Sequence, residues 1–253
     1  MRNLKYPIKM LGLAALLVVF STSMFAGLSP VIYNTGVNSG GLIGYPGTDA
    51  IFMEYTYGLT APILNANGTA PSGFTSSGAS VIEDPALYPL GPNPPWIANT
   101  ATAQWITTPD GDAATGDPGG ELGAGGFYVY TEAFSMTGFN PVGATLAGNF
   151  AADNGATAYL NGVLIGTTPY PLGFNSLTAL GNGAGDFHSG VNYLSFIVQN
   201  EPDGGSNPTG LFVDSLAITA MVLPTPEPAF YGVLAIGLAG LFVAVRSRKA
   251  VKA

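Results

Sequence analysis

The sequence has no cysteine and very little charge. Without cysteine there are no disulfides, no thiolate metal sites and no cysteine nucleophiles. Charged residues make up 9% of the chain, against roughly 25% in typical soluble domains. No lysine or arginine occurs between Met10 and Val245, and all 15 carboxylates lie within that interval. Because phosphate contacts need basic side chains, we expect no nucleic acid partner, and ion pairing with acidic polysaccharide is disfavoured.

The chain also offers little for catalysis. The one histidine is His188, in GDFHSG. The adjacent Ser189 does not complete a triad, because the fold must bring nucleophile, base and orienting acid together. We interpret His188 as a loop residue with a structural hydrogen bond. A glycosidase needs only two carboxylates roughly 5 to 10 Å apart, so that alternative stays open, but we predict that the protein is not an enzyme.

The N-terminus is typical of an export signal. Three basic residues precede the apolar run MLGLAALLVVF at 10–20, and STSMFAG then offers cleavage after Ala26 or after Ser23. The apolar run is too short for an uncleaved anchor, because a membrane span needs roughly 20 apolar residues. We therefore predict a signal peptide over residues 1–26.

The C-terminus is a second apolar segment, followed by basic residues. Residues 229–245 carry no charge, and as a helix they would span roughly 26 Å, close to the hydrocarbon core of about 30 Å. The basic tail 246–253 follows, and the positive-inside rule places it in the cytoplasm. Two prolines in Pro226-Glu227-Pro228 prevent the helix from continuing outward. The sequence thus predicts a single transmembrane helix with an extended peptide before it.

This ending resembles the PEP-CTERM sorting signal of Gram-negative bacteria. Residues 224–253 contain its three parts in order: the Pro-Glu-Pro triplet, a short helix rich in Gly, Ala and Leu, and a basic cluster. The resemblance implies processing by exosortase, a membrane-embedded transpeptidase-like enzyme, in lineages that make extracellular polysaccharide. The positions that match the signal are Pro226, Glu227, Pro228, Arg246, Arg248 and Lys249.

Between these termini the sequence predicts an all-β fold. Glycine (36 residues) and proline (20 residues) separate short β-branched and aromatic runs. Many short strands favour a jelly roll or β-sandwich, and we predict such an ectodomain over residues 27–223. Residues 59–94 have few strand candidates and predict long loops. The clearest strands are 126–134, 143–152, 156–160, 163–168, 191–199 and 211–222.

Two local patterns are sharper than the rest. Asn161-Gly162 between apolar runs predicts a type I′ hairpin, because both central positions need a positive φ. In VNYLSFIVQ, alternation predicts that Leu194, Phe196 and Val198 face the core. The stretch NFAADNGATAYLNGVLIGTT, together with FHSGVNYLSFIVQNEPDGGSNPTGLFVDSLAI, resembles the galactose-binding-like jelly rolls of bacterial surface proteins and glycosidase accessory modules. That resemblance implies the fold and hints at sugar binding.

Aromatic residues supply candidate ligand contacts. Trp96, in a proline-flanked loop, is a candidate for sugar contact because aromatic faces stack on the apolar C–H faces of sugars. Core or rim packing is the alternative for this residue. The other aromatic candidates are Trp105, Tyr45, Tyr55 and Tyr57.

An acidic, glycine-rich stretch, PDGDAATGDPGGE, is a candidate Ca²⁺ loop, because hard oxygen ligands on a flexible backbone suit this ion. Its ligands would be Asp110, Asp112 and Asp117, with Glu121 nearby. The stretch departs from the EF-hand pattern, and a solvated acidic loop is the alternative. Apart from Ca²⁺ we predict no cofactor.

Together these features predict an exported cell-surface or extracellular-matrix protein. It would be anchored in the inner membrane with a periplasmic ectodomain, and then be processed and reach the cell surface or the exterior. We expect the ectodomain to serve adhesion or carbohydrate binding linked to exopolysaccharide and biofilm. The alternatives are a secreted glycoside-active enzyme and a Ca²⁺-stabilised structural protein without a specific ligand.

Overall fold

The computed structural model is built mainly from strands, with one short helix among the residues that it describes. No helix in the described part of the chain is long and apolar enough to cross a membrane. The predicted signal peptide and both ends of the predicted transmembrane segment lie outside that part. The described residues are 28–72, 76–108, 125–181, 186–201, 208–224, 232 and 234–242, the last two belonging to the helix.

Twelve strands occur among these residues. They are β1 (Val37–Asn38), β2 (Gly41–Leu42), β3 (Thr48–Gly58), β4 (Ser76–Ile82), β5 (Ile106–Thr107), β6 (Gly126–Ser135), β7 (Phe139–Asp153), β8 (Gly155–Leu160), β9 (Val163–Thr167), β10 (Thr178–Ala179), β11 (Val191–Asn200) and β12 (Gly210–Val222).

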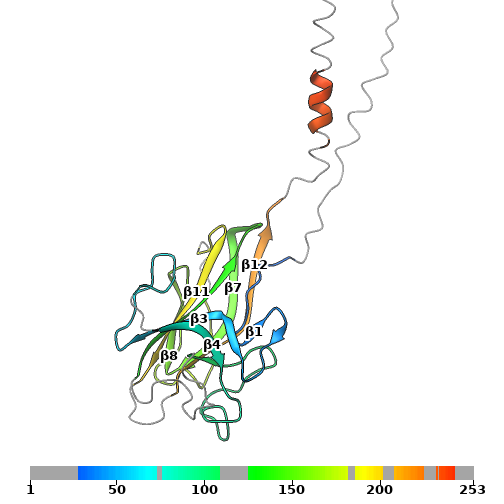
Figure 1. Ribbon diagram of the computed structural model, residues 1–253. Coiled ribbons are helices and arrows are strands. Elements are labelled where there is room, and N and C mark those ends of the chain that lie inside the picture. The colour runs from blue at the N-terminus through cyan, green and yellow to red at the C-terminus, as the bar shows by residue number, and fades with distance from the viewer. Residues whose placement is uncertain are drawn as a thin grey trace, which may run out of the picture.

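Ten of the strands form one antiparallel sheet that folds over on itself. The order is β10-β7-β12-β5-β4-β3-β6-β11-β8-β9, and β1 pairs separately with β2. The layer with β7 and β12 lies opposite the layer with β6 and β11 (Figure 1), and the rings of Phe150 and Phe196 meet across the gap at 5.4 Å. Beyond β10, the N–H of Gly181 donates to the carbonyl of Ile165 on β9, so the two sheet edges meet. The fold is a β-sandwich, as predicted.

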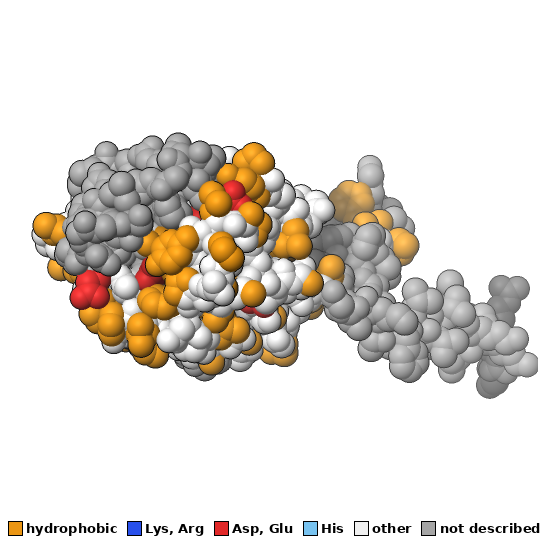
Figure 2. Space-filling view, turned by 90° about the horizontal axis from the view of Figure 1, so that it is seen from below, with side chains coloured by type: hydrophobic (Ala, Val, Ile, Leu, Met, Phe, Trp, Pro, Cys, Tyr) orange, Lys and Arg blue, Asp and Glu red, His pale blue; other side chains and the backbone are white. Residues whose placement is uncertain are grey.

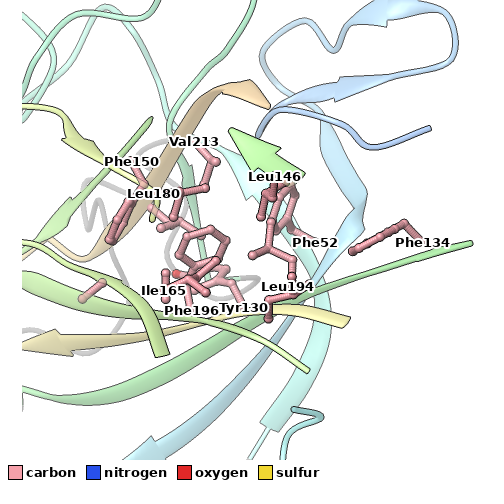
Figure 3. Close-up of a cluster of buried hydrophobic side chains, with 14 of the residues drawn as sticks. Phe52, Tyr130, Phe134, Leu146, Phe150, Ile165, Leu180, Leu194, Phe196 and Val213 are labelled. Atoms are coloured by element: carbon pink, nitrogen blue, oxygen red, sulfur yellow. The ribbon is translucent and has the colours of Figure 1, made fainter. Parts of the chain in front are cut away.

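Inward-facing side chains of both layers form the main core (Figure 3). Phe52 on β3 packs against Phe196 on β11 with ring centroids 6.3 Å apart, and both rings are fully buried. Leu194 and Val198 are also fully buried on the same face of β11, which confirms the predicted alternation. Each such apolar side chain stabilises the fold by about 1.5 to 3 kcal/mol.

The six predicted strands are present as β6, β7, β8, β9, β11 and β12, with ends shifted by a few residues. The predicted hairpin between β8 and β9 is confirmed, with φ of +50° at Asn161 and +84° at Gly162. The prediction for 59–94 was wrong over Ser76–Ile82, which is β4. Its sequence, SSGASVI, has little intrinsic β-preference, and pairing with β3 and β5 makes it a strand.

Candidate functional site

A pocket of about 330 Å³ opens on the outer face of β3, β6 and β11, the side turned away from the main core. This volume lies near the lower end of the range for ligand-binding pockets. Successive side chains of a strand alternate between faces, so Met53, next to buried Phe52, and Thr131, next to buried Tyr130, point outward into the pocket. The described lining consists of Ala50, Ile51, Met53, Tyr55, Thr69, Ala70, Thr131, Ala133 and Tyr193.

An irregularity in β3 shapes one wall of the pocket. The register of β3 with β4 shifts between Asp49 and Met53, leaving the intervening residues without cross-strand partners on β4. The Asp49 carboxylate fixes this bulge by accepting the N–H groups of Gly36 at 2.7 Å, Ile51 at 2.9 Å and Phe52 at 3.3 Å. The bulge turns the β3 chain so that Ile51 lines the pocket while Phe52 enters the core.

The loop after β3 forms the opposite rim. Ser195 on β11 donates its hydroxyl to the carbonyl of Gly68 at 2.7 Å, which ties the loop to the sheet. Gly68 has φ +85°, and a Cβ there would lie 2.5 Å from the backbone nitrogen of Gly162 in the hairpin turn. Only glycine allows this close approach. The contact places Thr69 and Ala70 at the edge of the pocket.

The floor is β6, and a tyrosine stands on each neighbouring strand. Thr131 on the floor lies 3.0 Å, hydroxyl to hydroxyl, from Ser195. Tyr55 on β3 is opposite Val129, whereas Tyr193 on β11 is opposite Ala133, four residues farther along β6. The two rings are therefore offset by about 14 Å along the strands.

The described lining carries no charged side chain. The carboxyl groups buried behind it are either neutral or negative. Glu132 points inward between Thr131 and Ala133, and its Oε1 accepts the N–H of Tyr33 at 2.9 Å. Burial raises the pKa of Glu132 to about 8, against the Tyr33 hydrogen bond, which lowers it, while the Asp49 charge adds to the rise. Figure 2 shows the molecule from below, where apolar and uncharged polar atoms dominate the described surface beside a few acidic side chains, and no lysine or arginine is visible.

The structure corrects the expected surface position of Trp96. Its side chain is only 3% exposed and packs on Trp105, with ring centroids 4.1 Å apart. Its Nε1 donates to Oδ2 of Asp153 at 3.0 Å. Both tryptophans belong to a second core with Ala151 and Phe212, on the outer face of β7 and β12. The segment after β4 covers these apolar strand residues, so the Trp96 ring is not available to stack on a sugar.

The other predicted site residues fall into three groups. Tyr55 lines the pocket, whereas Tyr45 packs partly buried against the main core. The exposed loop residue His188 donates its backbone N–H to Oδ1 of Asn192 at 2.8 Å. No group of three metal-ligating acids or histidines occurs in the described ranges. The candidates outside the described residues are Asp110, Asp112, Asp117, Glu121, Pro226, Glu227, Pro228, Arg246, Arg248 and Lys249.

Apart from Tyr55, the described pocket residues were not identified from the sequence. The alternation of VNYLSFIVQ places Tyr193 on the face opposite Leu194, and that signal could have marked it as a surface aromatic. Met53 and Thr131 had no such signal, because their place in the pocket depends on how β3 pairs with β6.

Comparison with known proteins gives no family for this chain. No family model and no curated protein matches it. Among solved structures, a β-glucuronidase from Bifidobacterium dentium, complexed with coumarin-3-O-glucuronide, matches at 18% identity and a TM-score of 0.37, over 68% of this chain and 20% of that one. A family 35 carbohydrate-binding module from an environmental isolate matches at 18% identity and a TM-score of 0.24, over 48% of this chain and 80% of that one. The chain thus spans about a fifth of the glucuronidase, and at these TM-scores neither likeness establishes a function.

Proposed function

We propose that this chain is an exported surface or matrix protein whose β-sandwich binds an uncharged carbohydrate in the pocket on β3, β6 and β11. The observation that carries the proposal is the lining, in which Tyr55 and Tyr193 flank a floor bearing the Thr131 hydroxyl. Tyrosine rings pack on the apolar C–H faces of sugars, and hydroxyl groups bond their oxygens. Such a mixture suits a neutral sugar chain better than a purely apolar ligand.

Charge supports the preference for neutral sugars. The described lining offers no cation to pair with a uronic acid or sulfate group, and the sequence between Met10 and Val245 contains no lysine or arginine. The buried carboxyls of Asp49 and Glu132 lie behind the wall and floor of the pocket. An anionic sugar would therefore meet a field that is neutral or repulsive.

The proposed activity is binding without turnover. Cleavage of a glycosidic bond needs two carboxylates flanking the bond, and the described lining has none. Adhesion to the producer's own exopolysaccharide, in a biofilm or matrix, is a role that needs binding alone. The Ca²⁺ alternative rests on Asp110, Asp112 and Asp117, outside the described residues.

The terminal segments supply the proposed route to the surface. Residues 1–26 would direct export, and residues 224–253 would hold the chain in the inner membrane until an exosortase-like enzyme processes it near Pro226-Glu227-Pro228. This route is inferred from the sequence pattern and from its resemblance to the PEP-CTERM signal. It places the sandwich where extracellular polysaccharide is made.

The proposal is tested by retention on immobilised oligosaccharides, neutral ones beside ones that contain uronic acids. We expect binding to neutral glycans, and a loss of about tenfold or more when Tyr55 or Tyr193 is replaced by alanine. Tyr170→Ala is the matched control, because Tyr170 is 49% exposed and does not line the pocket. Equal retention of all three variants, or binding confined to acidic glycans, would contradict the proposal.

A further inference from the structure

Exposed apolar side chains gather at the end of the sandwich where β12 finishes. Val142 on β7 is 74% exposed, Met221 on β12 is 67% exposed, and Leu223 just beyond β12 is 43% exposed. We call these three residues the apolar tip. The start of the described domain and the end of β12 lie at this same end of the molecule (Figure 1).

Strand pairing brings the three tip residues together. Met221 pairs with Asn140, and the N–H of Leu223 donates to the carbonyl of Gly138 at 2.8 Å. The register of β7 with β12 then shifts between Thr219 and Met221, so that the β7 chain bulges outward next to Met221. Val142 lies in this bulge and points away from the core.

In the described part of the chain, the segments that form the tip are uncharged. Residues 135–143, which connect β6 to β7 and form the bulge, carry no acidic or basic side chain, and neither do residues 215–224. The preceding carboxylate, Asp214, is buried and accepts hydrogen bonds from Thr102, Asn34 and the backbone of Ser215. The backbone carbonyl of half-buried Asp186 accepts a hydrogen bond from the side chain of Asn161 at 2.7 Å.

The length of chain after the tip indicates what this surface faces. Ala229, the first residue of the apolar C-terminal segment, lies five positions after Pro224, with four residues between them. Even fully extended, five residues reach only about 18 Å. A chain held in the bilayer by residues 229–245 therefore keeps the tip within about 18 Å of the hydrocarbon boundary, close to the headgroup layer.

We propose that the apolar tip rests in the headgroup region of the membrane that anchors the chain, and holds the sandwich against the lipid surface before processing. The inference depends on the membrane anchoring described under the proposed function, and not on sugar binding. A lipid surface fits the tip better than a second copy, because three side chains cannot supply the roughly 800 Å² per partner that a stable dimer buries. Apolar side chains beside uncharged backbone are the composition that enters a lipid interface.

The absence of cysteine allows a direct test with the full chain. Met221→Cys, Val142→Cys, Leu172→Cys and Leu238→Cys each create a unique site for an environment-sensitive fluorophore. The chain is reconstituted in vesicles of phosphatidylcholine and phosphatidylglycerol, and quenching by headgroup-nitroxide lipid is compared with quenching by aqueous iodide. Leu172, 51% exposed, is the control away from the tip, and Leu238 reports insertion of the C-terminal helix.

We expect nitroxide lipid to quench the labels at 221 and 142 at least about twofold more than the label at 172, and iodide to quench them less. Iodide access at 221 equal to that at 172, with 238 quenched by lipid, overturns the inference and leaves the anchoring intact. Shielding of 221 from both quenchers overturns it in favour of a second copy. A label at 238 that lipid does not quench overturns both the inference and the anchoring, while glycan retention still tests sugar binding separately.

Discussion

At the scale of residues, the buried carboxyl groups set the pH response of the fold. The domain has no lysine or arginine to form ion pairs with them, so only hydrogen bonds can offset the cost of burying these groups. Burial raises the pKa of Glu132 to about 8 and that of Asp153 to about 7, in the second case against a hydrogen bond from Trp96. The buried carboxylates are Asp49, Glu54, Glu83, Glu132, Asp153 and Asp214.

The first prediction is that the protein is more stable in mild acid than in mild alkali. Folded Glu132 holds its proton up to about pH 8, whereas the unfolded chain releases it near 4.5, so the free energy of unfolding falls as pH rises through that window. The full change corresponds to about 4 to 5 kcal/mol for this group. Urea unfolding at pH 5, 7 and 9 measures it.

Glu132→Gln should flatten this profile, because its amide oxygen can still accept the Tyr33 N–H but the group no longer ionises. Exposed Glu201→Gln is the control and should leave the profile unchanged. The Asp153 carboxyl keeps part of the slope in both variants. A wild-type protein whose stability rises steadily from pH 5 to 9 would show that these carboxyls are not buried as described.

The second prediction separates a core role of Trp96 from a ligand role. Trp96→Phe keeps an aromatic ring beside Trp105 but removes the Nε1 donor to Asp153. Because the buried carboxyl loses a hydrogen bond, we expect a loss of about 1 to 3 kcal/mol in the free energy of unfolding. Retention on neutral glycans should stay as in the wild type. Weaker retention on neutral glycans with an unchanged free energy of unfolding would indicate that Trp96 contacts the ligand.

The sequence identified part of the site at this scale. Tyr55 was among the aromatic candidates because ring chemistry is visible in the sequence. Trp96 was predicted to lie at the surface because loops flanked by prolines are usually exposed. In the fold, this loop packs on the apolar side chain of Phe212 and buries Trp96. Burial of a loop residue depends on such tertiary contacts and not on its neighbours in the chain.

At the scale of elements, the regular strands and the Asn161-Gly162 hairpin were predictable because their patterns are local. The structure added β3 and β4, which shape the pocket. The β3 strand contains a bulge fixed by Asp49, which interrupts the alternation of apolar and polar side chains. The β4 strand begins with small residues, which become a strand because they pair with β3. The pocket could therefore not be predicted from local sequence patterns.

The third prediction concerns the loop that forms the pocket rim. Gly68 and Gly138 have nearly the same φ, +85° and +87°, but only at Gly68 would a Cβ meet backbone, 2.5 Å from the nitrogen of Gly162. Gly138→Ala should cost about 1 to 2 kcal/mol from the positive φ alone. Gly68→Ala should cost more, and should also weaken glycan retention by displacing Thr69 and Ala70.

Thermal unfolding and glycan retention of Gly68→Ala and Gly138→Ala test this prediction. Equal melting temperatures and equal retention would mean that the loop does not sit against the hairpin. Lower stability of Gly68→Ala with normal retention would mean that the rim takes no part in binding.

At the scale of the whole molecule, we propose that a folded sandwich stands between two terminal address segments, one for export and one for sorting. The fourth prediction is that protein from the extracellular fraction of its host has a C-terminus near Pro226 to Pro228, whereas membrane protein retains the tail through Lys252. Intact mass and the C-terminal peptide of each fraction measure this. An extracellular form that retains the basic tail would contradict processing at the triplet.

Hydrogen exchange with and without a bound neutral oligosaccharide tests whether the outer pocket binds a neutral sugar chain. We expect slower exchange for amides of the rim loop, residues 65–70, and for the adjoining part of β11, residues 191–195. Protection confined to residues away from the pocket lining, with the rim unchanged, would contradict it and place the binding site elsewhere on the sandwich.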